Sequence, residues 1–207
     1  MNSNLRDIIS DALSSNQAQY VEIRFDQFEA THIRYRDRDL EEVNRTTSGR
    51  GCVRALDGGG WGFVSFNRLD DLGNKVKAAI RNARLVGGDP IELAPVEPVI
   101  DCVKSNVKKD PSKISLNDKK RLLDEYAGEI WSVPGITTST VGYGDSHLNR
   151  VFASSEGTYI EQEKLDISMR LSAVARNGGD VQQSGVSLGS AGDFSEIENL
   201  HSQASFV

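Results

Sequence analysis

The side chains best suited to bind a transition metal or to act as a general base are few in this sequence. Its three histidines, His32, His147 and His201, are far apart along the chain. The HExxH, CxxC and HxH spacings, which place two metal ligands on one helix face or one loop, are absent from the sequence. These residues therefore predict no metal site in this chain.

One short segment brings together the residue types of a hydrolase triad. Asp145, Ser146 and His147 are consecutive. Triad members ordinarily come from separate elements, and no GxSxG nucleophile elbow accompanies them. A surface turn is therefore the better prediction for this segment. His32 is predicted to be a partly exposed residue of a strand.

Other chemically suggestive residues have plain structural interpretations. The glycine-rich stretch 57–62 has no Lys-Ser or Lys-Thr after it and lies between two predicted strands, which favours a hairpin turn over a phosphate loop. Glu41 and Glu42, like the acidic run 161–163, lie beside turns and are expected to face solvent. Cys52 is expected in the core and Cys102 in a more exposed connector. No catalytic residue is predicted from residue chemistry.

Composition narrows the class of protein. The chain has 207 residues, of which 38% are hydrophobic and 26% charged, with a formal net charge of −6. These values are typical of a folded domain and argue against disorder. An acidic balance without a basic block argues against a nucleic-acid partner, and no apolar run is long enough to span a membrane. Two cysteines imply no disulfide framework, so a cytoplasmic location is expected.

Hydrophobic periodicity predicts the elements of the first half. Apolar residues at helical spacing predict a helix over 4–15, whereas Val21, Ile23 and Phe25 alternate with charged residues, as in a half-buried strand. Helical spacing returns over 69–83, with Asn67 as the expected N-cap. Further strands are predicted at 31–36, 40–46, 49–56 and 61–66.

A proline-containing connector separates this half from a similar second one. Ser115 and Asp118 form a capping box for a helix that reaches Ile130. A long alternating strand covers 165–176, and a hairpin turn at 177–180 leads into a strand over 181–188. The predicted class is α+β, with two α/β-meander units forming antiparallel curved sheets or a partial barrel, and helices packed on one face. The predicted divisions are an N-terminal unit at 1–88, a connector at 89–113, a second unit at 114–194 and a tail at 195–207.

Residues 20–72 and 154–185 resemble the TldD/PmbA family, once called modulators of DNA gyrase, and in particular its TldD branch. The segments that carry the resemblance are the alternating strand 21–25, Arg38-Asp39-Leu40-Glu41, Arg50-Gly51 with Val53-Arg54, the glycine-rich stretch 59–63, and the strand-and-turn segment 154–185. One departure is the absence of the glycine that the family usually places before the Leu-Glu pair.

The resemblance implies a zinc-dependent metallopeptidase that acts on unfolded peptides and pairs with a TldD/PmbA-type subunit in a homo- or heterodimer. The family's zinc is held by an HExxxH helix in a C-terminal domain, and no position of this chain matches that motif. Neither a catalytic residue nor a metal ligand is carried over, and no cofactor is expected in this chain. The tail at 195–207 is expected to lead toward that C-terminal domain.

Three interpretations remain open from the sequence. In the first, the chain is the N-terminal scaffold and peptide-cavity part of such a peptidase and is inactive alone. In the second, it is a complete short homologue that acts as a non-catalytic binding or regulatory partner. In the third, it is an unrelated enzyme with a site made of scattered carboxylates. For the first, an edge strand could pair with an extended peptide through backbone hydrogen bonds. The residues proposed for that strand are Leu165, Ile167, Met169, Leu171 and Ala173.

Overall fold

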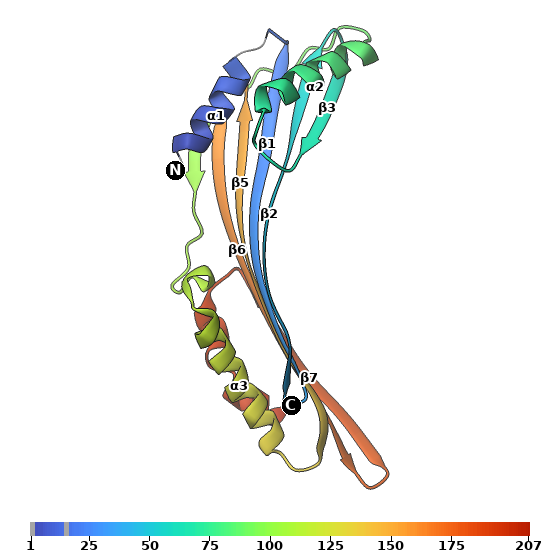
Figure 1. Cartoon of the computed structure of the whole chain (residues 1–207), viewed down its shortest axis with the longest axis vertical. Coiled ribbons are helices and arrows are strands. Elements are labelled where there is room, and N and C mark those ends of the chain that lie inside the picture. The colour runs from blue at the N-terminus through green and yellow to red at the C-terminus, as the bar shows by residue number, and fades with distance from the viewer. Residues whose placement is uncertain (1–2, 15–16) are drawn as a thin grey trace. The chain divides into compact units, whose positions relative to one another are not determined.

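The computed structural model describes residues 3–14 and 17–207 (Figure 1). They form two compact units, each assembled from three separate stretches of the chain. Unit 1 contains the described residues of Met1–Gln27, together with Ser48–Lys104 and Leu148–Glu163; unit 2 contains Phe28–Thr47, Ser105–His147 and Lys164–Val207. The compact units therefore differ from the continuous ranges 1–88 and 114–194, which remain predictions about domains along the chain.

Within the described residues there are four α-helices, two short 3-10 helices and seven strands. In chain order they are α1 (Ser3–Ser14), β1 (Tyr20–Arg36), β2 (Asp39–Asp57), β3 (Gly60–Phe66), α2 (Leu72–Val86), β4 (Ile100–Val103), η1 (Pro111–Lys113), α3 (Leu116–Ser132), β5 (Ile136–Ser154), β6 (Tyr159–Asn177), β7 (Asp180–Ser190), η2 (Phe194–Ile197) and α4 (His201–Phe206).

The seven strands belong to one sheet, in the order β3-β2-β1-β5-β6-β4, with β7 also paired to β6. The β2–β3 and β6–β7 pairs are antiparallel, whereas the short β4 runs parallel to β6. Among the described residues the path of paired strands is open, since no pairing joins its ends at β3 and β4. The predicted α+β class with an antiparallel sheet is confirmed.

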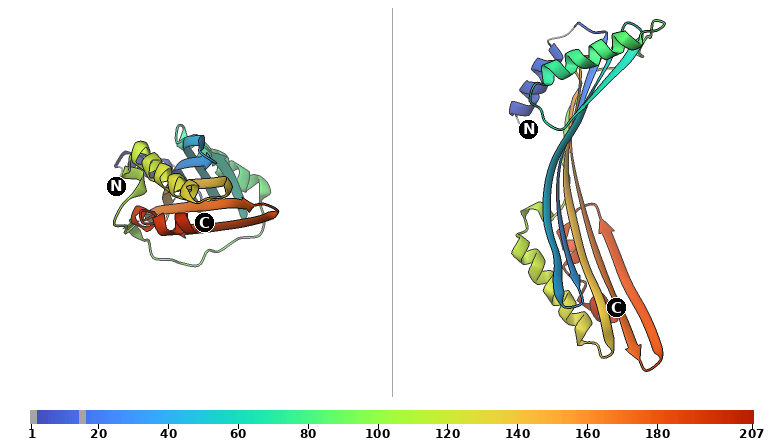
Figure 2. Two further views of the ribbon diagram at one scale, coloured as in Figure 1. Left: turned by 90° about the horizontal axis from the view of Figure 1, so that it is seen from below. Right: turned by 45° about the vertical axis from the view of Figure 1, so that its right-hand side comes forward.

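In unit 1, α1 and α2 cover one face of the sheet, and Figure 2 shows α2 running across the strands. The odd-numbered residues Val21, Ile23 and Phe25 of β1 point into this layer and are at most 4% exposed. They pack against the apolar stripes of both helices. Because successive strand residues point to opposite faces, the even-numbered residues of the same strand lie on the other face.

In unit 2, α3 and α4 pack on the sheet around a second core. Tyr126 of α3 is fully buried, and its hydroxyl donates a hydrogen bond to the carbonyl of Ile197 in η2. Ser115 caps α3 by accepting a hydrogen bond from the backbone N–H of Asp118, as its capping box predicts. The chain's end thereby joins the core of unit 2.

Several predicted elements are longer than expected. The strands predicted at 20–25 and 31–36 are one continuous β1, and those at 40–46 and 49–56 are one continuous β2. The prediction of Asn67 as an N-cap is wrong, because α2 begins after Asp71, which takes the left-handed conformation at φ 59°. Among the described residues of the predicted connector at 89–113, the only regular elements are β4 and η1.

Candidate functional site

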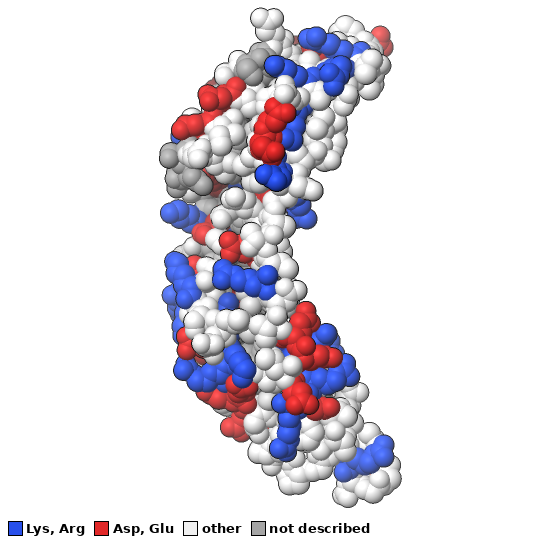
Figure 3. Space-filling view, in the orientation of Figure 1, with Lys and Arg blue, Asp and Glu red and all other residues white. Residues whose placement is uncertain are grey.

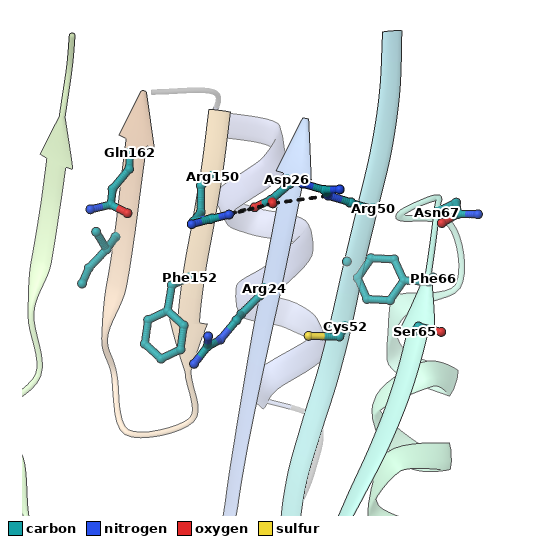
Figure 4. A pocket seen from close by; sticks show the side chains of 12 residues that line it. Arg24, Asp26, Arg50, Cys52, Ser65, Phe66, Asn67, Arg150, Phe152 and Gln162 are labelled. Atoms are coloured by element: carbon teal, nitrogen blue, oxygen red, sulfur yellow. Dashed lines mark hydrogen bonds and ion pairs between the residues drawn. The ribbon is translucent and has the colours of Figure 1, made fainter. Parts of the chain in front are cut away.

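A cavity of about 740 Å³ opens in unit 1 on the sheet face opposite α1 and α2 (Figure 4). It is floored by strands β6, β5, β1 and β2 and bordered by β3. Alternation places the site here: Val21, Ile23 and Phe25 point to the helices, so Arg24 and Asp26 point into the cavity. A volume of this size lies in the range of ligand pockets, about 300–1,000 Å³.

Asp26 lies between two arginines from neighbouring strands. Arg150 of β5 binds its carboxylate in a bidentate manner, with Nε–Oδ1 2.8 Å and Nη2–Oδ2 2.9 Å, and Arg50 of β2 lies 3.6 Å away from Oδ2. Figure 4 shows both guanidinium groups converging on this carboxylate. The hydrogen bonds from Arg150 hold the pKa of Asp26 below its ordinary value, so Asp26 is a carboxylate at neutral pH.

Glu22 makes a second cluster of the same kind on this face. Its carboxylate is buried, accepts a hydrogen bond from the Tyr20 hydroxyl, and lies 3.2 Å from Arg24 and 3.4 Å from Arg54. Burial, and then this hydrogen bond, raise the pKa of Tyr20, so its hydroxyl stays a donor. Each of the two carboxylates on this face therefore lies beside two arginines.

Aromatic rings accompany the arginines. The Arg24 guanidinium lies 5.2 Å from the centre of the Phe152 ring, and that of Arg54 lies 4.3 Å from the centre of the Trp61 ring. Both distances are typical of cation–π contacts. The face therefore offers planar hydrogen-bond donors beside apolar surface, which suits a ligand with both anionic or carbonyl oxygens and apolar groups.

Cys52 also lines this cavity, and it is half-buried there rather than in the core as predicted. Burial raises the pKa of its thiol, so it is a poor nucleophile at neutral pH. The described residues that line the cavity include no histidine. Across residues 3–14 and 17–207 there is no group of three or more His, Cys, Asp or Glu side chains placed to hold a metal ion. The described residues of this face can contact a ligand, but they include no set of side chains arranged for hydrolysis.

The prediction of a surface turn at 145–147 is wrong, because this segment is part of β5. Asp145 is buried in unit 2, where it pairs with Lys119 at 2.5 Å and accepts a hydrogen bond from the Tyr143 hydroxyl. A carboxylate already committed to a lysine and a tyrosine is unsuited to orienting a catalytic histidine. His32 is an exposed residue of β1, as predicted.

The prediction that 165–175 is an edge strand is wrong. This segment belongs to β6, which has β5 as one neighbour and pairs with β7 on its other side from Ile167 to Asn177. Its backbone groups are used within the sheet. The five side chains proposed for peptide pairing are at most 3% exposed, and they are Leu165, Ile167, Met169, Leu171 and Ala173. The long alternating strand is confirmed, but its alternation marks core residues rather than an accessible edge.

Two family domains account for most of this chain. Residues 21–84 match the PmbA/TldA metallopeptidase domain 1, and residues 109–206 match the central domain of the same family. The chain belongs to the PmbA/TldD metallopeptidase family. The arginine-lined cavity draws its residues from domain 1 and from β5 and β6 of the central domain.

Curated relatives in this family are metalloproteases. A metalloprotease of Synechocystis sp. is 40% identical over 187 residues, covering 89% of this chain and 40% of that protein. A metalloprotease of Methanothermobacter thermautotrophicus is 28% identical over 183 residues, covering 88% of this chain and 40% of that protein. The chain therefore spans about two fifths of the length of these relatives.

Solved structures of family members share the fold. A proposed modulator of a DNA gyrase from Thermotoga maritima matches with a TM-score of 0.75 at 14% identity, covering all of this chain and 47% of that one. TldE from Thermococcus kodakarensis matches with a TM-score of 0.70 at 14% identity, covering 99% of this chain and 46% of that one. At these identities the likeness concerns the PmbA/TldD fold alone.

Sequence reasoning missed the arginine-lined face as a site, because its residues come from five strands spread over a long stretch of the sequence. Two signals pointed to it. The alternation over 21–25 assigns Arg24 and Asp26 to the polar face, and Arg50 and Arg54 lie in the segment that resembles the PmbA/TldD family. Neither signal reveals Arg150, which approaches Asp26 only when β5 pairs beside β1.

Proposed function

We propose that this chain is the peptide-binding scaffold of a PmbA/TldD metallopeptidase, and that the arginine-lined face of unit 1 contacts an unfolded peptide substrate. The observation that carries the proposal is the cavity of about 740 Å³, lined by arginines and aromatic rings, in a chain whose family members are metalloproteases. Hydrolysis and zinc belong, in this proposal, to a family domain that holds the HExxxH helix, and this chain binds without cleaving.

The chemistry of the face supports a peptide ligand. An extended peptide exposes carbonyl oxygens along its whole length, and guanidinium groups donate hydrogen bonds to them in several directions. Phe152 and Trp61 supply apolar area for side chains. These contacts depend little on peptide sequence, so they favour unfolded chains over folded proteins, whose carbonyl groups are already paired.

The proposal includes a second family subunit and a cytoplasmic setting. Family members named TldD and TldE support pairing with a subunit of the same family. Cys52 and Cys102 are free thiols, as expected in a reducing compartment. No helix within the described part of the chain is long and apolar enough to cross a membrane. Figure 3 shows basic and acidic side chains interspersed on the visible surface of each unit, a pattern that gives no support to a nucleic-acid partner.

The test is binding of a fluorescently labelled polypeptide to the 207-residue chain, followed by anisotropy. The same polypeptide is used in two states, folded with its disulfides intact and unfolded after reduction and alkylation. We expect saturable binding of the unfolded state, much weaker binding of the folded state, and no cleavage with added zinc. Equal binding of both states, or none of either, would contradict the proposed function.

A further inference from the structure

The arginines of the cavity outnumber its carboxylates. Of the residues that line it, Arg24, Arg50 and Arg150 are cationic and Asp26 is anionic, whereas the whole chain carries a net charge of −6. A cationic cavity in an acidic protein raises the local concentration of anionic groups. The three arginines differ in how firmly they are held.

Arg150 is committed to Asp26 through two short hydrogen bonds, which fix the plane of its guanidinium group. Arg50 is only loosely attached, with Nε 3.6 Å from Asp26 and a side chain 70% exposed. Arg24 is 55% exposed, and it contacts Glu22 through an ion pair and the ring of Phe152 through its guanidinium. Because each guanidinium has five N–H donors, Arg50 and Arg24 keep donors available to a ligand.

Phe152 and Ile160 line the same cavity as these donors, and Figure 4 shows Phe152 beside Arg24. Apolar surface next to a charged donor lowers the local dielectric, which strengthens an ion pair formed there relative to one in open solvent. Asp26 acts as a fixed counter-ion for Arg150 and Arg50: it holds these two side chains together without satisfying all of their donors.

We propose that this cavity is a carboxylate subsite, in which the exposed guanidinium group of Arg50 binds an anionic carboxylate of the peptide. The inference rests on the proposed function, since the ligand is a peptide held on the same face. It adds a specificity: peptides with an acidic side chain, or with a free C-terminal carboxylate, bind more tightly than neutral peptides of the same shape.

The test compares three unfolded peptides on the 207-residue chain at low ionic strength. The first has one central Glu with blocked termini, the second has Gln in its place, and the third is the Gln peptide with a free C-terminal carboxylate. We expect the Glu peptide, the free-acid peptide, or both to bind about tenfold more tightly than the blocked Gln peptide. The arm that shows the preference identifies the source of the carboxylate.

Arg50→Gln should abolish this preference, so that the Glu peptide and the free-acid peptide bind no more tightly than the blocked Gln peptide. Arg121→Gln is the matched control: Arg121 is 72% exposed, has an ion pair with Asp118, and lies on α3 in unit 2. It should leave all three affinities unchanged. Thermal unfolding of both variants shows whether they fold like the parent chain.

The outcomes separate the two proposals. If all three peptides bind with the same affinity, or if Arg50→Gln retains the preference, the carboxylate subsite is wrong and the peptide-binding face stands. If none of the peptides binds to the parent chain, the proposed function fails and the subsite fails with it. If Arg121→Gln also removes the preference, the preference comes from the overall charge of the chain and the carboxylate subsite is wrong.

Discussion

Lys119 and Asp145 form an ion pair inside unit 2, with side chains 4% and 6% exposed. Their charges compensate each other, and the Tyr143 hydroxyl donates to the same carboxylate. Removing one partner leaves the other as an unpaired buried charge, which costs far more than the pair itself contributes. The structural role of Asp145 therefore depends on Lys119.

We expect Lys119→Met to lower the free energy of unfolding by about 3–5 kcal/mol, measured by urea denaturation. Lys119→Met combined with Asp145→Asn should recover more than half of that loss, because the amide still accepts from Tyr143 and no unpaired charge remains. The control is Lys120→Met, which removes a half-exposed pair with Asp124 and should cost much less, because solvent screens an exposed pair. Equal losses in Lys119→Met and Lys120→Met would refute this account.

Asp193 governs the acid sensitivity of the turn before η2. Hydrogen bonds from the Ser195 hydroxyl, and then from the backbone N–H of Lys108, lower the pKa of Asp193 to about 2. The folded-state pKa lies below the unfolded value of about 3.9. Its contribution to stability is therefore complete above about pH 4 and is lost as the pH falls toward 2.

We expect Asp193→Asn to lower the urea midpoint at pH 7 and to have a much smaller effect at pH 2, where about half of the parent residue is itself protonated. NMR titration of the Asp193 carboxyl group measures its pKa directly. A titration midpoint near 3.8, or a variant effect that is the same at both pH values, would contradict the assigned hydrogen bonds.

Residue patterns in the sequence correctly indicate that some polar side chains face solvent, but not which side chains the fold brings together. His32 is exposed on a strand and Glu41 is exposed beside Arg34, as predicted. The burial of Asp145 could not be predicted, because it depends on Lys119, which reaches it from a helix more than twenty positions earlier. The Arg150–Asp26 contact likewise depends on strand pairing rather than on local sequence.

At the scale of elements, α2 lies very close to β3, and Gly62 makes this approach possible. A Cβ at Gly62 would lie 1.9 Å from the carbonyl oxygen of Ala79 and 2.4 Å from the N of Ala83. Both are backbone atoms of α2, so relief would require movement of the helix. This helix covers the core of unit 1, behind the sheet face that forms the cavity.

We expect Gly62→Ala to destabilise the chain by about 2–3 kcal/mol through overpacking, as measured by urea denaturation. Gly73→Ala is the matched control, since Gly73 lies in α2 itself and a methyl group added there would have no neighbouring atom within 4 Å. It should be neutral or about 0.5 kcal/mol more stable, because alanine favours the helix. A neutral Gly62→Ala would show that α2 does not lie this close to β3.

The elements themselves are largely predictable from the sequence, and their lengths are not. Alternation at 21–25 and 165–175 identifies β1 and β6 because one face of each is buried against helices. The first ten residues of β2 are exposed or half-buried on both faces, so they show no period and the sequence predicts a break there. Backbone pairing, rather than side-chain burial, continues the strand through such a segment.

At the scale of the whole molecule, domains 1 and 2 of the PmbA/TldD family are present, and the chain spans about two fifths of its curated relatives. In the proposed function, this chain binds the peptide and catalysis belongs to another family domain. The resemblance in the sequence predicts the family, and the hydrophobic periodicity predicts the α+β class. The two compact units are less accessible to prediction, since four long strands contribute residues to both.

Native mass spectrometry tests this division of labour most directly, because one spectrum reports bound zinc, bound peptide and cleaved peptide. The 207-residue chain is dialysed against zinc, freed of loosely held metal and mixed with an unfolded peptide. We predict a complex of the chain with intact peptide and no stoichiometric zinc. One tightly held zinc ion per chain, together with cleaved peptide, would contradict the assignment of catalysis to another part of the enzyme.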